Sequence, residues 1–153
     1  MNLITFPNFE EALNKASKAD EEIEIHLKSG KSEGTLPALI GVPVSIKDHI
    51  TVKGISNTVG WASLADNKSD KNSLVVDILI SHGAILFVSS NISQGILNFD
   101  SSNNLWGKAQ NPWNRKKVSG GSSGGETALV ASLCSPFRIA STLLISFFSF
   151  VFI

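Results

Sequence analysis

The residues that could carry chemistry gather in a glycine- and serine-rich stretch, residues 119–126, which runs Ser-Gly-Gly-Ser-Ser-Gly-Gly-Glu. Its glycines free the backbone to turn sharply and let a ligand approach closely. A helix-like run over residues 127–133 follows, and a helix start offers unpaired N–H groups and the positive end of a dipole. Hydroxyls held there suit acyl or phosphoryl chemistry. The same composition is common in flexible linkers, so the stretch alone leaves both interpretations open.

Lys47 is the second candidate, because it follows a predicted buried strand over residues 42–46. The carboxyl end of a strand is the edge at which α/β sheets bind ligands. Apolar neighbours disfavour a charged amine, so the pKa of such a lysine falls and it can act as a base. Taken alone, Lys47 is more simply a surface lysine at a strand end. Together with the serine pair it indicates a serine–lysine arrangement, in which a neutral amine activates a hydroxyl.

The elements that position these residues follow from the spacing of apolar side chains. Residues 73–81 have the pattern of an amphipathic helix, Gly83 is placed to end it, and residues 84–88 form an apolar run typical of a buried strand. Helix, glycine and strand in this order predict half of a parallel α/β crossover. Residues 51–70 and 99–113 are expected to be loops, and long loops in compact domains are usually functional.

A further helix is predicted to begin at Asn8, with Glu11 completing a capping box. Phe9, Leu13 and Ala16 then fall near one face of this helix.

Composition limits the class of protein. The 153 residues suit one domain, and the 42% of hydrophobic residues suffice for a folded core. Lys plus Arg equals Asp plus Glu at 13 each, which gives no support for a nucleic-acid partner. The single cysteine excludes an internal disulfide framework, and the three histidines lack metal-ligand spacing. No cofactor or metal is therefore expected, and no signal peptide is visible in the first twenty residues.

Two segments resemble the motifs of the amidase signature family. Residues 41–48, Gly-Val-Pro-Val-Ser-Ile-Lys-Asp, are similar to its lysine motif, and residues 120–126 are similar to its Gly/Ser signature. Residues 83–88 and 111–113 lie in the expected order between them, and the resemblance covers about residues 36–137.

Within the family, residues 90–94, residues 99–103 and Glu126 most resemble the fatty-acid amide hydrolases. The A subunits of the glutamyl-tRNA amidotransferases are a weaker match over the same stretch. The resemblance implies a partial α/β fold, a mixed β-sheet flanked by helices that is incomplete in this chain.

The resemblance also implies a Ser–cis-Ser–Lys mechanism that hydrolyses amides through an acyl-enzyme. Lys47 matches the general base, and Ser122 matches the bridging serine, whose peptide bond is cis in the family. Ser123 would be a supporting hydrogen-bond donor at the substrate site, or equally a solvated loop hydroxyl. Ile96 falls where the hydrolases place an apolar substrate-lining residue, although core packing is the simpler role for it.

The nucleophile motif of the family, Thr-Asp-Ile-Gly-Gly-Ser, is not found where it is expected. From Arg138 the sequence changes to an apolar run, and counting without gaps places Ser146 at the nucleophile position among unrelated neighbours. We therefore expect residues 1–137 to be the N-terminal part of an amidase-signature domain and residues 138–153 to be an unrelated apolar segment. Such a chain would be inactive alone.

Three functions remain open from the sequence. The first is hydrolysis of fatty-acid amides by the complete enzyme, with a lipid amide as partner and an intracellular, membrane-associated location if it is like the hydrolases. The second is a non-catalytic, membrane-associated fragment, although residues 139–153 would reach only about 22 Å as a helix, short of a bilayer core of roughly 30 Å. The third is an amidase or amidotransferase acting on small or tRNA-linked amides. The oligomeric state is not predicted.

Overall fold

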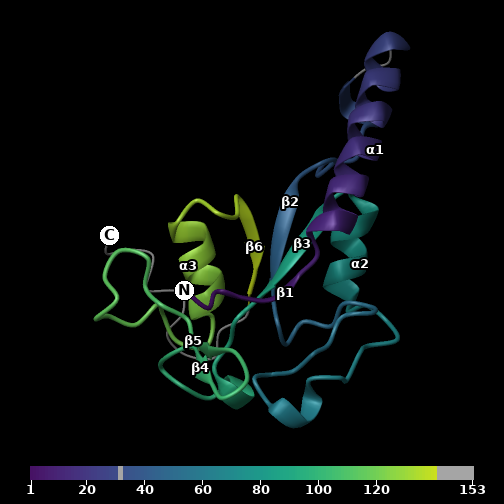
Figure 1. Ribbon diagram of the computed structural model, residues 1–153. Coiled ribbons are helices and arrows are strands. Elements are labelled where there is room, and N and C mark those ends of the chain that lie inside the picture. Colours follow the sequence, from purple (N-terminus) through teal and green to yellow (C-terminus); the bar gives the residue numbers. More distant parts are fainter. Residues whose placement is uncertain (31–32, 141–153) are drawn as a thin grey trace.

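The computed structural model describes residues 1–30 and 33–140 (Figure 1). The predictions for Ser146 and for most of the apolar segment lie outside these residues. The architecture is a sheet with helices packed against it, and loops gather at one end of the sheet. The expected fold class, a mixed α/β sheet flanked by helices, is confirmed.

The main sheet has four strands in the order β1-β3-β2-β6. Strand β2 at its centre lies parallel to both neighbours, whereas β1 lies antiparallel to β3. The strands span Ile4–Pro7 (β1), Pro43–Lys47 (β2), Ile85–Ser90 (β3) and Phe137–Ile139 (β6). The parallel pairing of β2 with β3 confirms the predicted crossover.

Within residues 1–30 and 33–140, three α-helices pack around this sheet, and a small hairpin lies in the loop that precedes α3. The helices span Phe9–Lys28 (α1), Leu74–Ser81 (α2) and Gly124–Ala131 (α3), with short 3₁₀ turns at Glu33–Thr35, Ala62–Leu64 and Gln94–Ile96. The hairpin pairs β4 (Ser102–Asn103) with β5 (Gly107–Lys108).

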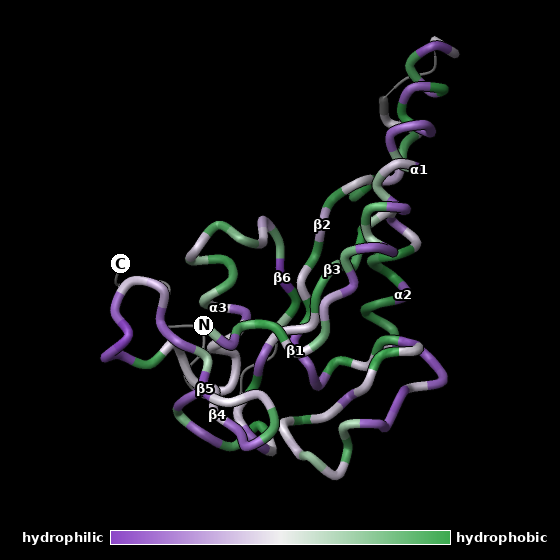
Figure 2. The backbone as a smooth tube through the Cα atoms, viewed as in Figure 1, coloured by the Kyte–Doolittle hydropathy of each residue, from purple (hydrophilic) through white to green (hydrophobic). Residues whose placement is uncertain are grey.

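The core lies between α2 and the two central strands. Alternate residues of β2 and β3 face α2, as the two-residue period of a strand requires, and Figure 2 shows these elements as largely hydrophobic. The buried cluster consists of Val44, Ile46, Val76, Leu79, Ala84 and Leu86. Gly83 ends α2 as predicted: its φ is +87°, and a Cβ there would lie 2.7 Å from the Cα of Ile40.

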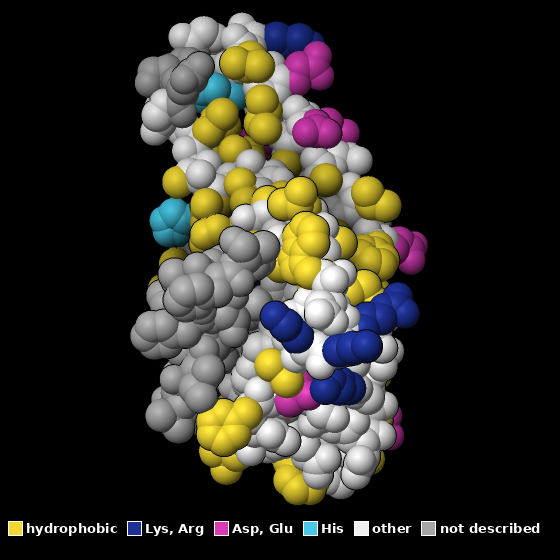
Figure 3. All heavy atoms as spheres, turned by 90° about the vertical axis from the view of Figure 1, so that its left-hand side faces the viewer, with side chains coloured by type: hydrophobic (Ala, Val, Ile, Leu, Met, Phe, Trp, Pro, Cys, Tyr) yellow, Lys and Arg dark blue, Asp and Glu magenta, His cyan; other side chains and the backbone are white. Residues whose placement is uncertain are grey.

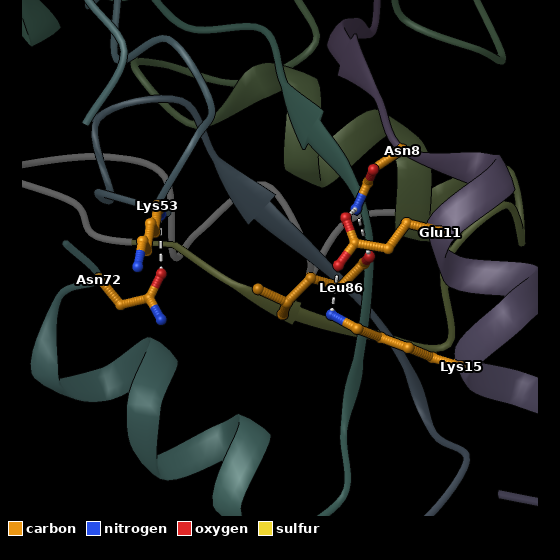
Figure 4. Close-up of polar contacts among 6 residues, drawn as sticks. All are labelled: Asn8, Glu11, Lys15, Lys53, Asn72 and Leu86. Carbon is orange, nitrogen blue, oxygen red and sulfur yellow. Dashed lines mark hydrogen bonds and ion pairs between the residues drawn. The ribbon is translucent and has the colours of Figure 1, made fainter. Parts of the chain in front are cut away.

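Helix α1 begins after Asn8 as predicted, but the capping box does not form. The side chain of Asn8 makes no cap hydrogen bond; its amide donates to Glu11 at 3.2 Å and to the carbonyl of Leu86 at 3.4 Å (Figure 4). Glu11 is also held by an ion pair with Lys15 at 2.7 Å. The side chains of Asn8 and Glu11, which a capping box would use, therefore bind the carbonyl of Leu86 on β3 and the amine of Lys15 instead.

The predicted apolar face of α1 is only partly correct. Ala12 and Ala19 are buried, whereas Phe9 and Leu13 are 51% and 69% exposed. The large side chains line an open groove between α1 and the strands, with Phe87 on its other wall. The smaller side chains of Ala12 and Ala19 are the ones that α1 buries against the rest of the protein.

Among the residues that the structure describes, no helix is long and apolar enough to cross a bilayer.

Candidate active site

Lys47 and the serine pair meet in the interior of the protein. Lys47 is the last residue of β2 and is fully buried. Its Nζ lies 3.0 Å from the Oγ of Ser122 and 2.8 Å from the Oγ of Ser123. Both serines immediately precede α3, and they are also buried. The structure thus brings together three of the four residues predicted for the site, although they are 75 positions apart in the sequence.

Burial lowers the pKa of Lys47 from its ordinary value to about 8, and the negative charge of Glu126 opposes this shift. A buried ammonium loses its hydration, which favours the neutral amine. The expected lowering of the lysine pKa is confirmed. An amine in this range can lose and regain a proton near neutral pH, as a general base must.

The Gly/Ser loop needs its glycines because neighbouring groups pass very close to it. A Cβ on Gly124 would lie 2.3 Å from the Oγ of Ser119, and one on Gly125 would lie 2.3 Å from the carbonyl oxygen of Asn91. Ser101 fixes the loop from outside: its Oγ donates to the carbonyl of Gly121 and accepts from the N–H of Gly124. The predicted tight turn before a helix is therefore present, held by a residue of the preceding loop.

The cis peptide expected at Ser122 is wrong for this structure, because no peptide bond among the described residues is cis. The trans form of a non-proline peptide is favoured by about 2.5–4 kcal/mol, so a cis bond requires its surroundings to enforce it. With the trans bond, the hydroxyls of both serines face the same amine. Ser123 is therefore a buried partner of Lys47, and the alternative of a solvated loop hydroxyl is wrong.

A buried glutamate beside this cluster was not assigned a role from the sequence. Glu126 is fully buried, and its Oε2 lies 2.6 Å from the Oγ of Ser45. Burial raises the pKa of Glu126 to about 7, while the hydrogen bond from Ser45 and the charges of Arg138 and Lys47 oppose this shift. Its place in the Gly/Ser motif was visible in the sequence, but its partner on β2 was not.

Asp48 anchors the loop after β2. Its carboxylate accepts hydrogen bonds from the N–H and the hydroxyl of Thr58, and that hydroxyl also accepts from the indole of Trp106 at 3.1 Å. Burial raises the pKa of Asp48, and these bonds from Thr58 oppose the shift. Burial and the charge of Lys47 lower the pKa of His49 to about 4, so this histidine is neutral near pH 7. The network joins the two predicted loops beside Lys47.

Ile96 lies apart from these contacts, in the turn after β3. Since Ser90 pairs with Lys47 in the register of the sheet, this turn begins at the same edge as the lysine. Ile96 is half-buried and has φ of +66°, a conformation that β-branched residues rarely adopt. Its contact with substrate stays a prediction.

No group of three or more His, Cys, Asp or Glu side chains among the described residues could hold a metal ion.

Comparison with known proteins identifies the family. A sequence model of the family described as Amidase matches residues 1–142. The chain belongs to the amidase signature family. The matched range extends beyond residue 137, the expected domain boundary. Strand β6 also crosses this boundary, and it pairs Arg138 with Ser45. The division at that boundary stays a prediction.

Three similar proteins show the range of this family. The vitamin D3 hydroxylase-associated protein of Gallus gallus is 44% identical over 77% of this chain and 25% of its own length. A glutamyl-tRNA(Gln) amidotransferase chain of Protochlamydia amoebophila is 34% identical over 86% of this chain and 26% of its own length. A solved structure of fatty acid amide hydrolase is 31% identical over 83% of this chain and 21% of its own, with a TM-score of 0.74. The chain thus spans about a quarter of the length of the curated relatives it matches.

Proposed function

We propose that this chain carries the lysine-containing half of an amide-hydrolysing site, and that the complete enzyme cleaves amide bonds through an acyl-enzyme. The observation that carries the proposal is the buried Lys47 amine within 3.0 Å of the hydroxyls of Ser122 and Ser123. A neutral amine next to a hydroxyl is a recognised arrangement for activating a serine.

Each residue then has a defined part in proton transfer. Neutral Lys47 accepts the proton of Ser122, and Ser122 accepts the proton of the attacking serine hydroxyl. The oxygen of that serine forms the bond to the amide carbon, and the carbon–nitrogen bond breaks as the proton returns along the same path to the departing nitrogen. Water, deprotonated along the same path, then attacks the acyl carbon. The ester bond to the serine breaks as the serine oxygen takes the proton back, and the acid is released. Ser123 hydrogen-bonds Lys47 at 2.8 Å and holds the amine in line with Ser122.

The attacking serine is assigned neither to Ser122 nor to Ser123, because both are buried against Lys47, at 6% and 1% exposure. A nucleophile must reach the carbonyl of a substrate. We therefore propose that the chain by itself does not hydrolyse amides. A fluorophosphonate serine probe tests this: no labelling is expected, and labelling that disappears in both Ser146→Ala and Lys47→Ala would contradict it.

For the substrate we propose fatty-acid amides. The proposed partner is therefore a lipid amide, and we propose that the complete enzyme associates with membranes. The motifs around residues 90–103 support this choice. The similarity to a glutamyl-tRNA amidotransferase chain is of the same order, so an amide carried on tRNA is the second candidate. Balanced charge speaks against a nucleic-acid partner, since tRNA binding normally draws on an excess of basic residues.

A chimaeric enzyme tests the activity. Residues 1–137 replace the matching part of a full-length fatty-acid amide hydrolase, and kcat is measured on a long-chain and a short-chain amide. We expect hydrolysis favouring the long chain, and a loss of about 10²–10⁴-fold in Lys47→Met, the range that general-base catalysis supplies. Lys53→Met, at an exposed lysine of the following loop, is the matched control and should change little. A folded, active chimaera that is insensitive to Lys47→Met would refute the proposed base.

The pH dependence of that activity follows from the lowered pKa of Lys47. Because the base must be neutral, kcat/KM should rise with pH and level off above about 8, where the amine has lost its proton. A profile that is flat between pH 6 and 9 would exclude Lys47 as the titrating base.

A further inference from the structure

Glu126 ties α3 directly to β2, and through Ser45 and Ser135 to β6. The glutamate lies in the first turn of α3, fully buried, and accepts a hydrogen bond from the Oγ of Ser45 on β2 at 2.6 Å. The same Oγ lies 2.9 Å from that of Ser135, which donates to the carbonyl of Phe137 at 2.7 Å. A carboxylate removed from water is costly unless it has such partners.

The strand register makes this contact relevant to Lys47. Side chains alternate along a strand, so Ser45 and Lys47, two residues apart on β2, face the same side of the sheet. On α3, Glu126 lies three residues after Ser123, which occupies the N-cap position of the helix. The bond between Ser45 and Glu126 therefore fixes the first turn of α3, and with it both serines, against the strand that carries the lysine.

Charges on neighbouring elements act on the same carboxylate. Lys47 on β2 and Arg138 on β6 both favour its ionised form. Arg138 also donates to the hydroxyl of Thr127, the residue after Glu126, at 3.0 Å. The other titratable groups near Lys47 are Asp48, bound to Thr58, and His49, whose low pKa leaves it neutral near pH 7. Glu126 is thus the acidic group on which the charges of a buried amine and a half-buried guanidinium act.

We infer that Glu126 is a positioning residue for the amide-hydrolysing site: it holds the two serines over Lys47 through Ser45 and supplies the counter-charge that sets how readily Lys47 gives up its proton. The catalytic meaning of this role rests on the proposed function. The coupling between the carboxylate and the amine does not, because it is a property of the folded chain.

The titration of Lys47 tests the coupling in the chain without any substrate. With lysine labelled with ¹³C at Cε, the Lys47 resonance is identified by its absence in Lys47→Met, and its midpoint is followed by NMR. In Glu126→Gln, which keeps the size of the side chain and an acceptor for Ser45, the midpoint should fall by about one pH unit because an opposite charge is lost. Glu10→Gln, an exposed glutamate of α1, is the matched control and should leave the midpoint unchanged.

The reverse measurement keeps the inference testable if Glu126→Gln fails to fold. Coupling between two sites is reciprocal, so Lys47→Met should raise the midpoint of the Glu126 carboxyl resonance. An unchanged Lys47 midpoint in folded Glu126→Gln, an unchanged Glu126 midpoint in Lys47→Met, or an equal shift in Glu10→Gln would each overturn the inference. Failure of the proposed function would instead leave these shifts intact while the chimaera hydrolyses no amide.

Discussion

The hydroxyl of Ser101 is the group on which the shape of the Gly/Ser loop most directly depends. It is fully buried, donates to the carbonyl of Gly121 at 2.8 Å and accepts from the N–H of Gly124 at 2.7 Å. Removal leaves the N–H of Gly124 and the carbonyl of Gly121 with only the longer bond, 3.3 Å, that they make to one another. A weakly satisfied buried donor and acceptor cost more than the net value of a hydrogen bond. We expect Ser101→Ala to lower the free energy of unfolding by about 2 kcal/mol in urea titrations.

Ser102 provides the matched control one residue later. It is partly exposed and lies in β4. Ser102→Ala should change the free energy of unfolding by less than about 0.5 kcal/mol, as surface substitutions usually do. Equal effects of the two substitutions would show that the Ser101 bonds do not hold the loop.

The sequence made Lys47 and the serine pair visible because their residue types and local neighbours already indicate chemistry. Glu126 and Ser101 could not be assigned in the same way. Their roles depend on partners on other elements, Ser45 on β2 for the glutamate and the loop glycines for Ser101. A buried polar contact between distant segments leaves no local pattern.

The approach of α3 to the end of β3 is set by Gly125. A Cβ at this position would lie 2.3 Å from the carbonyl oxygen and 2.6 Å from the nitrogen of Asn91, backbone atoms that cannot move aside locally. Asn91 is itself fixed, because its amide donates to the carbonyl of Asn2 and its oxygen accepts from Asn103. Gly125→Ala should therefore push the helix away from the strand and destabilise the fold by about 3 kcal/mol, measured by urea unfolding.

Gly30→Ala separates this clash from the general effect of replacing a glycine. Gly30 has φ of +66° and open space around it, so its substitution should cost only about 1 kcal/mol, from the left-handed backbone. A cost of Gly125→Ala no greater than that of Gly30→Ala would contradict the close-packing argument.

Elements with local signals were predicted well. The apolar pattern of α2, its glycine stop and the following strand β3 are all found within one or two residues of their expected bounds. Strands β1 and β6 were missed, because each has at most four residues and takes its partner from a distant part of the chain. Short strands of this kind exist only through tertiary pairing, so periodicity cannot reveal them.

At the scale of the whole molecule, much apolar surface stays open to water. Figure 3 shows hydrophobic side chains gathered on one face, with Lys and Arg side chains below them. A groove of about 380 Å³ between α1 and the strands is lined almost wholly by apolar residues, including Phe9, Leu13 and Phe87. In the described part of the chain, strands β1 and β6 form the two edges of the main sheet. Large apolar patches and open strand edges both favour association, so we expect the isolated chain to be marginally stable and to self-associate.

Two substitutions on α1, Leu13→Gln and Ile25→Gln, identify the surface that drives self-association. Leu13 and Ile25 are both 69% exposed, but Leu13 lines the groove and Ile25 lies further along the helix, beyond the residues that line it. If burial of the groove drives association, Leu13→Gln should shift sedimentation toward the monomer clearly more than Ile25→Gln. Equal shifts would assign association to apolar surface in general. A monomeric wild-type chain with a cooperative, reversible thermal transition would contradict the expectation altogether, because it would show that the groove is stable in water.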